Sequence, residues 1–265
     1  MARLIAFANR KGGSGKTATT VNVAACLAEL GYSTLVVDLD AQAHASISLG
    51  ISPYQLDQSV YELLTDETIK IDDVIQRTAF KNLDILPASQ KMERANEDLN
   101  GVKTVETILA QKFEPVIHHY TYILFDCPAA PGLVLNNALT AAKELMIPMQ
   151  TQFLAMEGLA QMTRMVYAVN ATLNPALKIT GVIPTLCNLR TRLAQTVLKE
   201  VRKNFTAELL YPPIRMNIQL AEAPSHGQPI IYYAPNSNGA ADYRKLTTHL
   251  LNPKLQTLQI SEELQ

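Results

Sequence analysis

The sequence has little cysteine, no tryptophan and no long hydrophobic run. Its 265 residues include three cysteines, Cys26, Cys127 and Cys187, at wide spacings and without a Cys-x-x-Cys pair. A disulfide framework and a structural zinc site are therefore not expected, because both need closely spaced cysteines. No stretch approaches the ~20 apolar residues of a membrane-spanning helix, and the N-terminal apolar stretch is too short for a signal peptide. These absences predict a cytoplasmic protein with reduced cysteines.

Charge is scarce and nearly balanced, but it is unevenly distributed. Charged residues make up 18% of the chain, and 23 basic against 24 acidic side chains leave a net charge of −1. This balance excludes a globally basic nucleic-acid binder, though not a local basic patch. Residues 1–150 carry a net charge of −5 and residues 151–265 one of +4. With 48% hydrophobic residues, we expect one domain over residues 1–265, with a peripheral tail from position 252 onward.

Short apolar runs alternate with helix-like segments along the chain. The runs are apolar throughout rather than alternating in polarity, which is typical of a parallel sheet covered on both faces. They are Leu4–Ala8, Thr34–Val37, Leu83–Leu86, Tyr122–Phe125, Leu145–Met149 and Ile179–Ile183. The alternation predicts a doubly wound, mostly parallel α/β sheet flanked by helices, with ligands at the carboxyl ends of the strands.

Two segments between these runs have the spacing of amphipathic helices. One covers Thr17–Leu30 and is stopped by Gly31, in the place of a helix C-cap. The other covers Arg192–Phe205, where Leu193, Val197, Val201 and Phe205 recur every four residues. We expect these four side chains on the buried face.

A glycine-rich loop, NRKGGSGKT (9–17), follows the first expected strand. Glycines let successive N–H groups point at phosphate oxygens, and the next helix adds the positive end of its dipole. Lys16 can reach the β and γ phosphates, and the Thr17 hydroxyl can ligate Mg²⁺. The strict pattern GxxxxGK[ST] fails because Arg10 occupies its first glycine position. The alternative is a glycine-rich turn without a ligand, but the place between a strand and a helix favours a phosphate-binding loop.

This loop and several later segments resemble the ParA/MinD superfamily of dimeric ATPases. KGGSGKT resembles the superfamily's deviant Walker A motif. The resemblance continues through VVDLDAQ (36–42), SLGI (48–51), FDCP (125–128), NNALTAA (136–142) and EAPSHGQPI (222–230). The chain most closely resembles the small ParA/Soj partition ATPases. This implies a P-loop NTPase with ATP and Mg²⁺ as ligands, and nucleotide contacts from Lys11, Gly12, Gly13, Ser14, Gly15, Lys16, Thr17 and Ala18.

The same resemblance gives Lys11 a role across a subunit boundary. It implies an ATP-gated homodimer in which Lys11 of each subunit reaches the phosphates of the other. A cation there can stabilise charge that develops on the transferred phosphoryl group. The alternative for Lys11 alone is a solvated loop charge.

Three aspartates follow expected strands at the ligand-binding edge. Asp38 and Asp40 are two residues apart and share one face of an extended segment, where carboxylates hold a Mg²⁺ shell or orient the attacking water. By resemblance, Asp40 is the hydrolytic aspartate and Asp38 supports Mg²⁺ and its waters. The structural alternative is that both cap the next helix. Asp126 after YILF is the expected Walker B carboxylate, which reaches Mg²⁺ through water.

Other matches to the family are looser. Ala41 stands where the family usually has proline, and Ala129, Ala130 and Pro131 alter the middle of its DCPPSLG switch. Glu157 resembles the glutamate of a segment near the nucleotide and the dimer interface, or is an ordinary first-turn helix glutamate. Thr185 matches a position where related ATPases contact adenine, and a strand-end threonine that caps a turn is the alternative.

A basic cluster lies in the second half of the chain. It comprises Arg190, Arg192, Lys199, Arg202 and Lys203, offset by Glu200. Such a cluster suits sequence-independent contacts to phosphates, or is a solvated helix face. By resemblance, Arg190 matches an arginine with which Soj-like proteins grip DNA. A second such arginine falls on Gln219, and Arg215 is the neighbour that could compensate for it.

The ends of the chain separate branches of the superfamily. The tail is broken by Pro253 and ends acidic, unlike the basic amphipathic membrane helix of MinD-like proteins, so no membrane partner is expected. The first strand begins by residue 4, so no N-terminal helix-turn-helix domain is expected. The resemblance thus implies a nucleoid-associated partition ATPase with a ParB-like stimulating partner. The alternative is a ParA-like positioning ATPase whose ATP dimer binds a protein scaffold rather than DNA.

Overall fold

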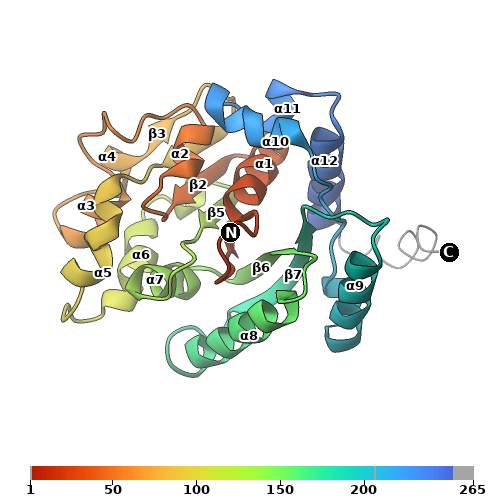
Figure 1. The fold of residues 1–265 in the computed structure, drawn as a ribbon. Coiled ribbons are helices and arrows are strands. Elements are labelled where there is room, and N and C mark those ends of the chain that lie inside the picture. The colour runs from red at the N-terminus through yellow and green to blue at the C-terminus, as the bar shows by residue number, and fades with distance from the viewer. Residues whose placement is uncertain (1, 206, 253–265) are drawn as a thin grey trace.

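The computed structural model describes residues 2–205 and 207–252. A seven-stranded sheet has the order β3-β4-β2-β5-β1-β6-β7. Its strands are β1 (Arg3–Phe7), β2 (Thr34–Asp38), β3 (Gln76–Arg77), β4 (Leu83–Leu86), β5 (Tyr122–Asp126), β6 (Glu144–Gln150) and β7 (Lys178–Thr185). All neighbours pair in parallel except the edge pair β3–β4. The predicted doubly wound, mostly parallel sheet is thereby confirmed (Figure 1).

Helices connect the strands and cover the sheet. The α-helices are α1 (Lys16–Glu29), α2 (His44–Ser48), α3 (Val60–Thr65), α4 (Ile71–Val74), α5 (Ala95–Asp98), α6 (Ile108–Phe113), α7 (Leu133–Ala141), α8 (Ala155–Thr172), α9 (Arg192–Asn204), α10 (Ile218–Glu222), α11 (Ile230–Tyr233) and α12 (Asn238–Leu251). The 3₁₀ turns are η1 (Gln90–Arg94), η2 (Val105–Thr107), η3 (Ile117–His119), η4 (Ala207–Leu209) and η5 (Ala223–His226).

The two faces of the sheet bury alternate residues of the same strand. Leu4 and Ala6 of β1 belong to one apolar cluster, and Ile5 and Phe7 belong to the other. The first cluster lies under α3, α6, α7, α8 and α9, and the second under α1, α11 and α12. Because both faces are covered, the strands have no polar side, which explains their continuous apolar sequences.

The six predicted strands and two predicted helices form within two residues of their expected bounds. Gly31 follows α1 with a φ of 91°, as expected for a C-terminal glycine. On α9, Val197 and Val201 are buried as predicted, but Leu193 is 48% exposed. Its position in the first turn carries it past the edge of the core. The prediction that Leu193 faces the core was therefore wrong.

The strand register places the predicted site residues at one edge of the sheet. β1 lies between β5 and β6, although the chain passes from β1 to β2. Asp38 and Asp126 are direct partners at the ends of β2 and β5. Such a point, where connections run to opposite sides, is where doubly wound sheets bind ligands.

Two further expectations concern membrane-spanning helices and the C-terminal tail. In the described part of the chain, no helix is both long and apolar enough to cross a bilayer. Most of the tail predicted to be peripheral, residues 253–265, lies outside the described residues.

Candidate functional site: the phosphate loop and its carboxylates

The glycine-rich loop curls between β1 and α1. Gly13 and Gly15 have φ values of 68° and 85°, which lie in the left-handed region that residues with a Cβ rarely adopt. Gly15 is the N-cap of α1, and no side chain of the described residues caps this end of the helix. The first amides of α1 are thus left for an anion, as at helix ends that bind phosphate. Lys16 follows at the first position of the helix and is only 7% exposed.

Side chains from the ends of β6 and β7 hold this loop. Gln150 Nε2 donates to the Gly13 carbonyl at 2.5 Å, and Thr185 Oγ1 donates to the Ser14 carbonyl at 2.7 Å. Asn9 Nδ2 donates to the Pro148 carbonyl at 2.8 Å. The Gly13 and Ser14 carbonyls thereby point toward the side chains at the ends of β6 and β7. Sequence reasoning missed Gln150 and Asn9, although their places directly after expected strands were a usable signal.

Thr185 has a different neighbour from the predicted adenine. Its side chain is 2% exposed and its hydroxyl is bonded to the loop. A Cβ at Gly15 would lie 3.2 Å from Thr185 Cγ2. Thr185 therefore packs beneath Gly15 as a support of the phosphate loop, and its predicted contact with adenine stays a prediction.

Lys11 is held within its own chain. Its ammonium donates to Gln152 Oε1 at 2.6 Å, and its backbone N–H donates to Asn9 Oδ1 at 3.0 Å. Gln152 lies just beyond β6 and is exposed. The predicted contact of Lys11 with the phosphates of another subunit would require this hydrogen bond to be exchanged.

Asp38, the last residue of β2, and Asp40 accept hydrogen bonds from the segment that follows β2. Asp38 is fully buried; its Oδ2 accepts the Ser46 N–H at 2.8 Å and the Ser46 hydroxyl at 2.7 Å, and its Oδ1 accepts the Asp40 N–H at 3.2 Å. Asp40 is half-buried, and its Oδ1 accepts the Gln42 N–H at 3.0 Å. Burial raises the pKa of Asp38 to about 6, although the hydrogen bonds from Ser46 and Asp40 lower it. The hydrogen bonds from Ser46 to Asp38 match the alternative interpretation, in which Asp38 caps the next helix, α2.

Asp126 is equally buried but has no such partners. Neither of its carboxylate oxygens accepts a well-formed hydrogen bond from any residue in the described ranges. Burial and the nearby Asp38 carboxylate raise the pKa of Asp126 well above its usual range, while the Thr17 hydroxyl and the Lys16 ammonium oppose this. A buried carboxylate without a well-formed hydrogen bond has free acceptor capacity for a metal ion or for water bound to one.

Glu157 lies in the first turn of α8. Its side chain is exposed, and its Oε1 accepts from Gln161 Nε2 at 3.3 Å. This placement matches the ordinary first-turn glutamate of the alternative interpretation. Among the described residues, the hydrogen bond of Glu157 is made within α8 and not with the phosphate loop.

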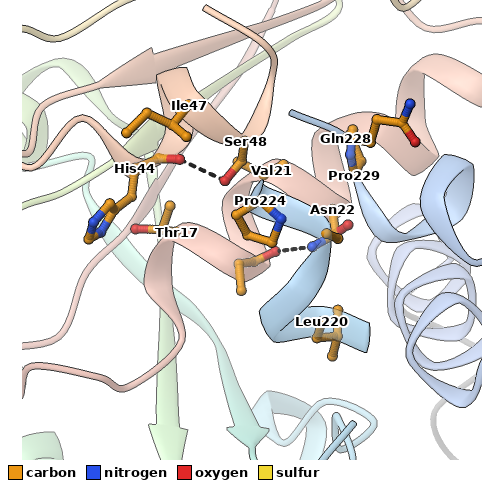
Figure 2. A pocket seen from close by; sticks show the side chains of 12 residues that line it. Thr17, Val21, Asn22, His44, Ile47, Ser48, Leu220, Pro224, Gln228 and Pro229 are labelled. Atoms are coloured by element: carbon orange, nitrogen blue, oxygen red, sulfur yellow. Dashed lines mark hydrogen bonds between the residues drawn. The ribbon is translucent and has the colours of Figure 1, made fainter. Parts of the chain in front are cut away.

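A cavity of about 290 Å³ lies beside Thr17, between α1, α2 and the segment 220–229. Figure 2 shows Thr17 and His44 at one side of it and Leu220, Pro224 and Pro229 at the other. Two of its polar residues are already bonded: Asn22 Nδ2 donates to the Ala18 carbonyl at 2.8 Å and Ser48 Oγ to the His44 carbonyl at 2.6 Å. Open space therefore adjoins the phosphate loop on the side that faces α2.

The predicted DNA-binding residues lie mainly on and before α9. Arg190, Arg192, Lys199 and Lys203 are exposed and Arg202 is half-buried. No ion pair joins these five side chains to another residue within 2–205 and 207–252. The helix buries its opposite face through Ala194, Val197, Leu198 and Val201.

Arg215 is placed differently from this cluster. Its Nη2 lies 2.7 Å from Asp242 Oδ1, and its Nε and backbone N–H also donate to the Asp242 carboxylate. Gln219 is exposed on α10. The structure thus ties Arg215 to α12, which weakens its predicted use as a substitute DNA contact for Gln219.

Comparisons with known proteins agree with this site. A family model described as an AAA domain matches residues 2–179. The chain is 42% identical to the sporulation initiation inhibitor protein Soj of Bacillus subtilis, over 93% of this chain and 97% of the relative. It is 36% identical to the chromosome partitioning protein ParA of Myxococcus xanthus, over 94% and 88%. The chain belongs to the ParA/Soj family of P-loop ATPases.

Solved structures extend the comparison to the fold. Cobyrinic acid a,c-diamide synthase of Mycobacterium smegmatis, with bound ADP and magnesium, superposes with a TM-score of 0.82 at 32% identity, covering 95% of this chain and 94% of that one. MinD of Pyrococcus horikoshii, complexed with Mg-ADP, has a TM-score of 0.77 at 24% identity, covering 95% and 97%. As a ParA/Soj-family member, the chain is an ATP hydrolase, and its phosphate loop is the family's deviant Walker A motif.

The residues of this ParA/Soj-type site fit a Mg²⁺ ion. Mg²⁺ keeps several waters and needs only one or two protein ligands, so it does not require a cluster of His, Cys, Asp or Glu, and the described residues form none. The Thr17 hydroxyl would supply an inner ligand, and the Asp126 carboxylate would accept from metal-bound water. When bound, the ion would neutralise phosphate charge, and Lys16 and the amides of α1 would hold the phosphates.

Proposed function

We propose that this chain is a Mg²⁺-dependent ATPase that forms an ATP-gated dimer, binds DNA without sequence preference and drives chromosome or plasmid partition with a ParB-like partner. It is a cytoplasmic, nucleoid-associated protein formed by a single domain. The observation that carries the proposal is the largely exposed basic cluster on and before α9, on a molecule whose other half is acidic. The name of the chromosome partitioning protein ParA of Myxococcus xanthus supports partition as its role.

Binding of ATP with Mg²⁺ is supported by the site and by solved relatives. The M. smegmatis synthase is solved with ADP and magnesium, and also with an ATP analogue and magnesium. In this chain Lys16, Thr17 and Asp126 provide the corresponding chemistry, and Asp40 is the proposed hydrolytic residue because it is half-buried at the same edge. Asp38 contributes by fixing the segment that carries Asp40, through the bond to the Asp40 N–H.

Dimerisation is supported by apolar side chains that flank the phosphate loop. Phe153 and Leu154 follow β6 and are 84% and 55% exposed. Leu186 (42% exposed) follows β7, and Met216 (69% exposed) follows Arg215, which forms a parallel bridge with Cys187. Exposed apolar groups at one edge of a soluble domain mark an interaction surface. A second subunit on this edge would cover them and bring its Lys11 to the nucleotide.

The basic cluster is suited to phosphate-backbone contacts. Cations on one face of a helix neutralise phosphates and release counterions, which makes binding strongly dependent on salt. Dimerisation doubles such a surface. Hydrolysis, stimulated by the ParB-like partner, would return the protein to the monomer and release DNA.

A second candidate function is a positioning ATPase whose ATP dimer binds a protein scaffold. Two observations favour it: Gln219 is uncharged, and Arg215 is paired with Asp242. Both reduce the cationic surface near α10. In this case, the dimer edge would still form but would not retain DNA.

The test is DNA binding by the Asp40→Ala protein with ATP, ADP or no nucleotide over a salt series. We expect tight binding only with ATP, with log affinity falling by about 0.9 per log unit of salt for each phosphate that the protein neutralises. Adding Arg190→Ala should reduce that slope by about 1, because it removes one cation from the DNA-binding surface. The matched control is Lys81→Ala, at the opposite edge of the sheet. Dimerisation without DNA retention would overturn the DNA proposal and favour the scaffold.

A further inference from the structure

Helix α7 begins without a capping side chain from its own segment. Its N-cap is Gly132, and no side chain of that residue can serve the first turn. Instead, the N–H of Val134, the second residue of the helix, donates to Asn96 Oδ1 at 3.2 Å. An N-cap side chain normally accepts from the second or third amide of its helix. Asn96 therefore caps α7 from a separate element, α5.

The absence of a side chain at position 132 makes room for this cap. A Cβ on Gly132 would lie 2.8 Å from Asn96 Cγ and 2.9 Å from Asn96 Nδ2. Contacts this short do not occur between real side chains, so any larger residue at 132 would displace the Asn96 amide. Gly132 and Asn96 form one unit.

The element that carries Asn96 is anchored from behind. The Tyr61 hydroxyl of α3 donates to Asp98 Oδ2 at 2.7 Å. Ala95 and Leu99, on either side of Asn96, are buried in the same apolar cluster as Val134 and Leu135 of α7. Figure 1 shows α5 beside α7. The position of Asn96 is therefore fixed independently of the loop that it contacts.

This cap lies at the far end of the segment that starts at Asp126. Residues 127–132 join the end of β5 to α7, so the sheet fixes one end of the segment and Asn96 the other. We infer that Asn96 is a positioning residue for ATP hydrolysis, which caps α7 and holds segment 127–132, directly after Asp126, in place at the ligand-binding edge of the sheet. The inference rests on the proposed role of Asp126.

The experiment compares ATP hydrolysis and amide exchange in the full chain and its variants. Asn96→Ala removes the cap, and Asn96→Asp keeps an acceptor of equal capping strength. Gly132→Ala displaces Asn96 without altering it, and the double variant Asn96→Ala/Gly132→Ala clears the space again. Asn100→Ala, an exposed asparagine just after α5, is the matched control. Midpoints of thermal unfolding establish that each variant is folded.

We expect Asn96→Ala to lower kcat about 5-fold or more, because segment 127–132 loses its hold at α7. Exchange of the Val134 amide should become faster, because this amide loses its acceptor. KM should not change, because the cap holds only the start of α7 and not the phosphate loop. Asn96→Asp should restore both to within about 2-fold. Gly132→Ala should match Asn96→Ala, and the double variant should be no worse than either, because coupled residues are not additive. Wild-type kcat in Asn96→Ala, failure of Asn96→Asp to restore it, or multiplying effects of the two alanines would overturn the inference. Absence of ATP hydrolysis in the wild-type chain would instead sink the proposed function, while Val134 exchange would still report on the cap.

Discussion

The ends of β2 and β5 present two aspartates side by side, with opposite surroundings. Asp38 accepts three hydrogen bonds, whereas Asp126, its partner in the strand register, accepts no well-formed one from the described residues. Both are fully buried. The fold satisfies the Asp38 carboxylate and leaves the Asp126 carboxylate without a well-formed hydrogen bond from the described residues. We propose that a cation completes the β5 side of the site, whereas the β2 side is held by the protein alone.

The largest expected effect is the loss of the Lys16 ammonium, which acts on Asp126 and on bound phosphates. Lys16→Ala should weaken ATP binding by about 100-fold or more, because charge-assisted contacts to phosphate are each worth roughly 1.5–3 kcal/mol. Isothermal titration with ATP and Mg²⁺ measures this, with Lys81→Ala as the control. Retention of wild-type affinity would show that the phosphate loop does not bind the triphosphate.

On the β2 side, Asp40→Ala separates binding from hydrolysis. We expect kcat to fall by about 100-fold or more, as for loss of a group that orients the attacking water, while the affinity for ATP stays within about 3-fold. Single-turnover hydrolysis and ATP titration measure the two effects. Turnover like that of the wild type would remove Asp40 from the mechanism.

The two buried aspartates should respond to substitution with opposite signs in the absence of Mg²⁺. Asp38→Ala leaves three donors without an acceptor and should lower the free energy of unfolding by roughly 1–3 kcal/mol. Asp126→Asn removes an unsatisfied carboxylate and should leave the free energy of unfolding unchanged or raised. Urea unfolding in EDTA measures both. Equal losses of unfolding free energy in the two variants would contradict the difference between the two carboxylates.

A smaller effect is expected in the pH dependence of the unfolding free energy, through the raised pKa of Asp38. Because the pKa of Asp38 is about 6 when folded and about 4 when unfolded, the folded chain binds an extra proton between these values. Without metal, the contribution of Asp38 to the unfolding free energy should therefore fall as pH rises from about 4 to 6, by at most about 3 kcal/mol. Urea unfolding of wild type and Asp38→Asn across this window measures it; curves that run parallel would contradict the raised pKa.

The fold and the phosphate loop were predictable because their causes are local. Continuous apolar runs and the order strand, glycine-rich loop, helix specify the parallel strands and the phosphate loop. The edge strand Gln76–Arg77 was not predicted, because two residues carry no periodicity and pair only when β4 is in place.

The contacts that complete the site could not be read from the sequence. Gln150 meets Gly13 across 137 positions of the chain, and Asn96 meets Val134 across 38. Thr185 shows the same limit, because its residue type and strand-end position fit a ligand contact and a loop support equally well. The packing of Thr185 under Gly15, which shows the loop support, joins residues 170 positions apart and could not be read from the sequence.

The central claim is that Asp126, and not Asp38, is the carboxylate on which Mg²⁺ binding depends. The most direct measurement is a Mg²⁺ titration of ATP-analogue binding in wild type, Asp126→Asn and Asp38→Asn. We predict that Asp126→Asn raises the Mg²⁺ concentration needed for half-maximal binding by about 10-fold or more, since metal-side carboxylates are typically worth that much, while folded Asp38→Asn shifts it by less than about 3-fold. A larger shift in Asp38→Asn than in Asp126→Asn would contradict the account.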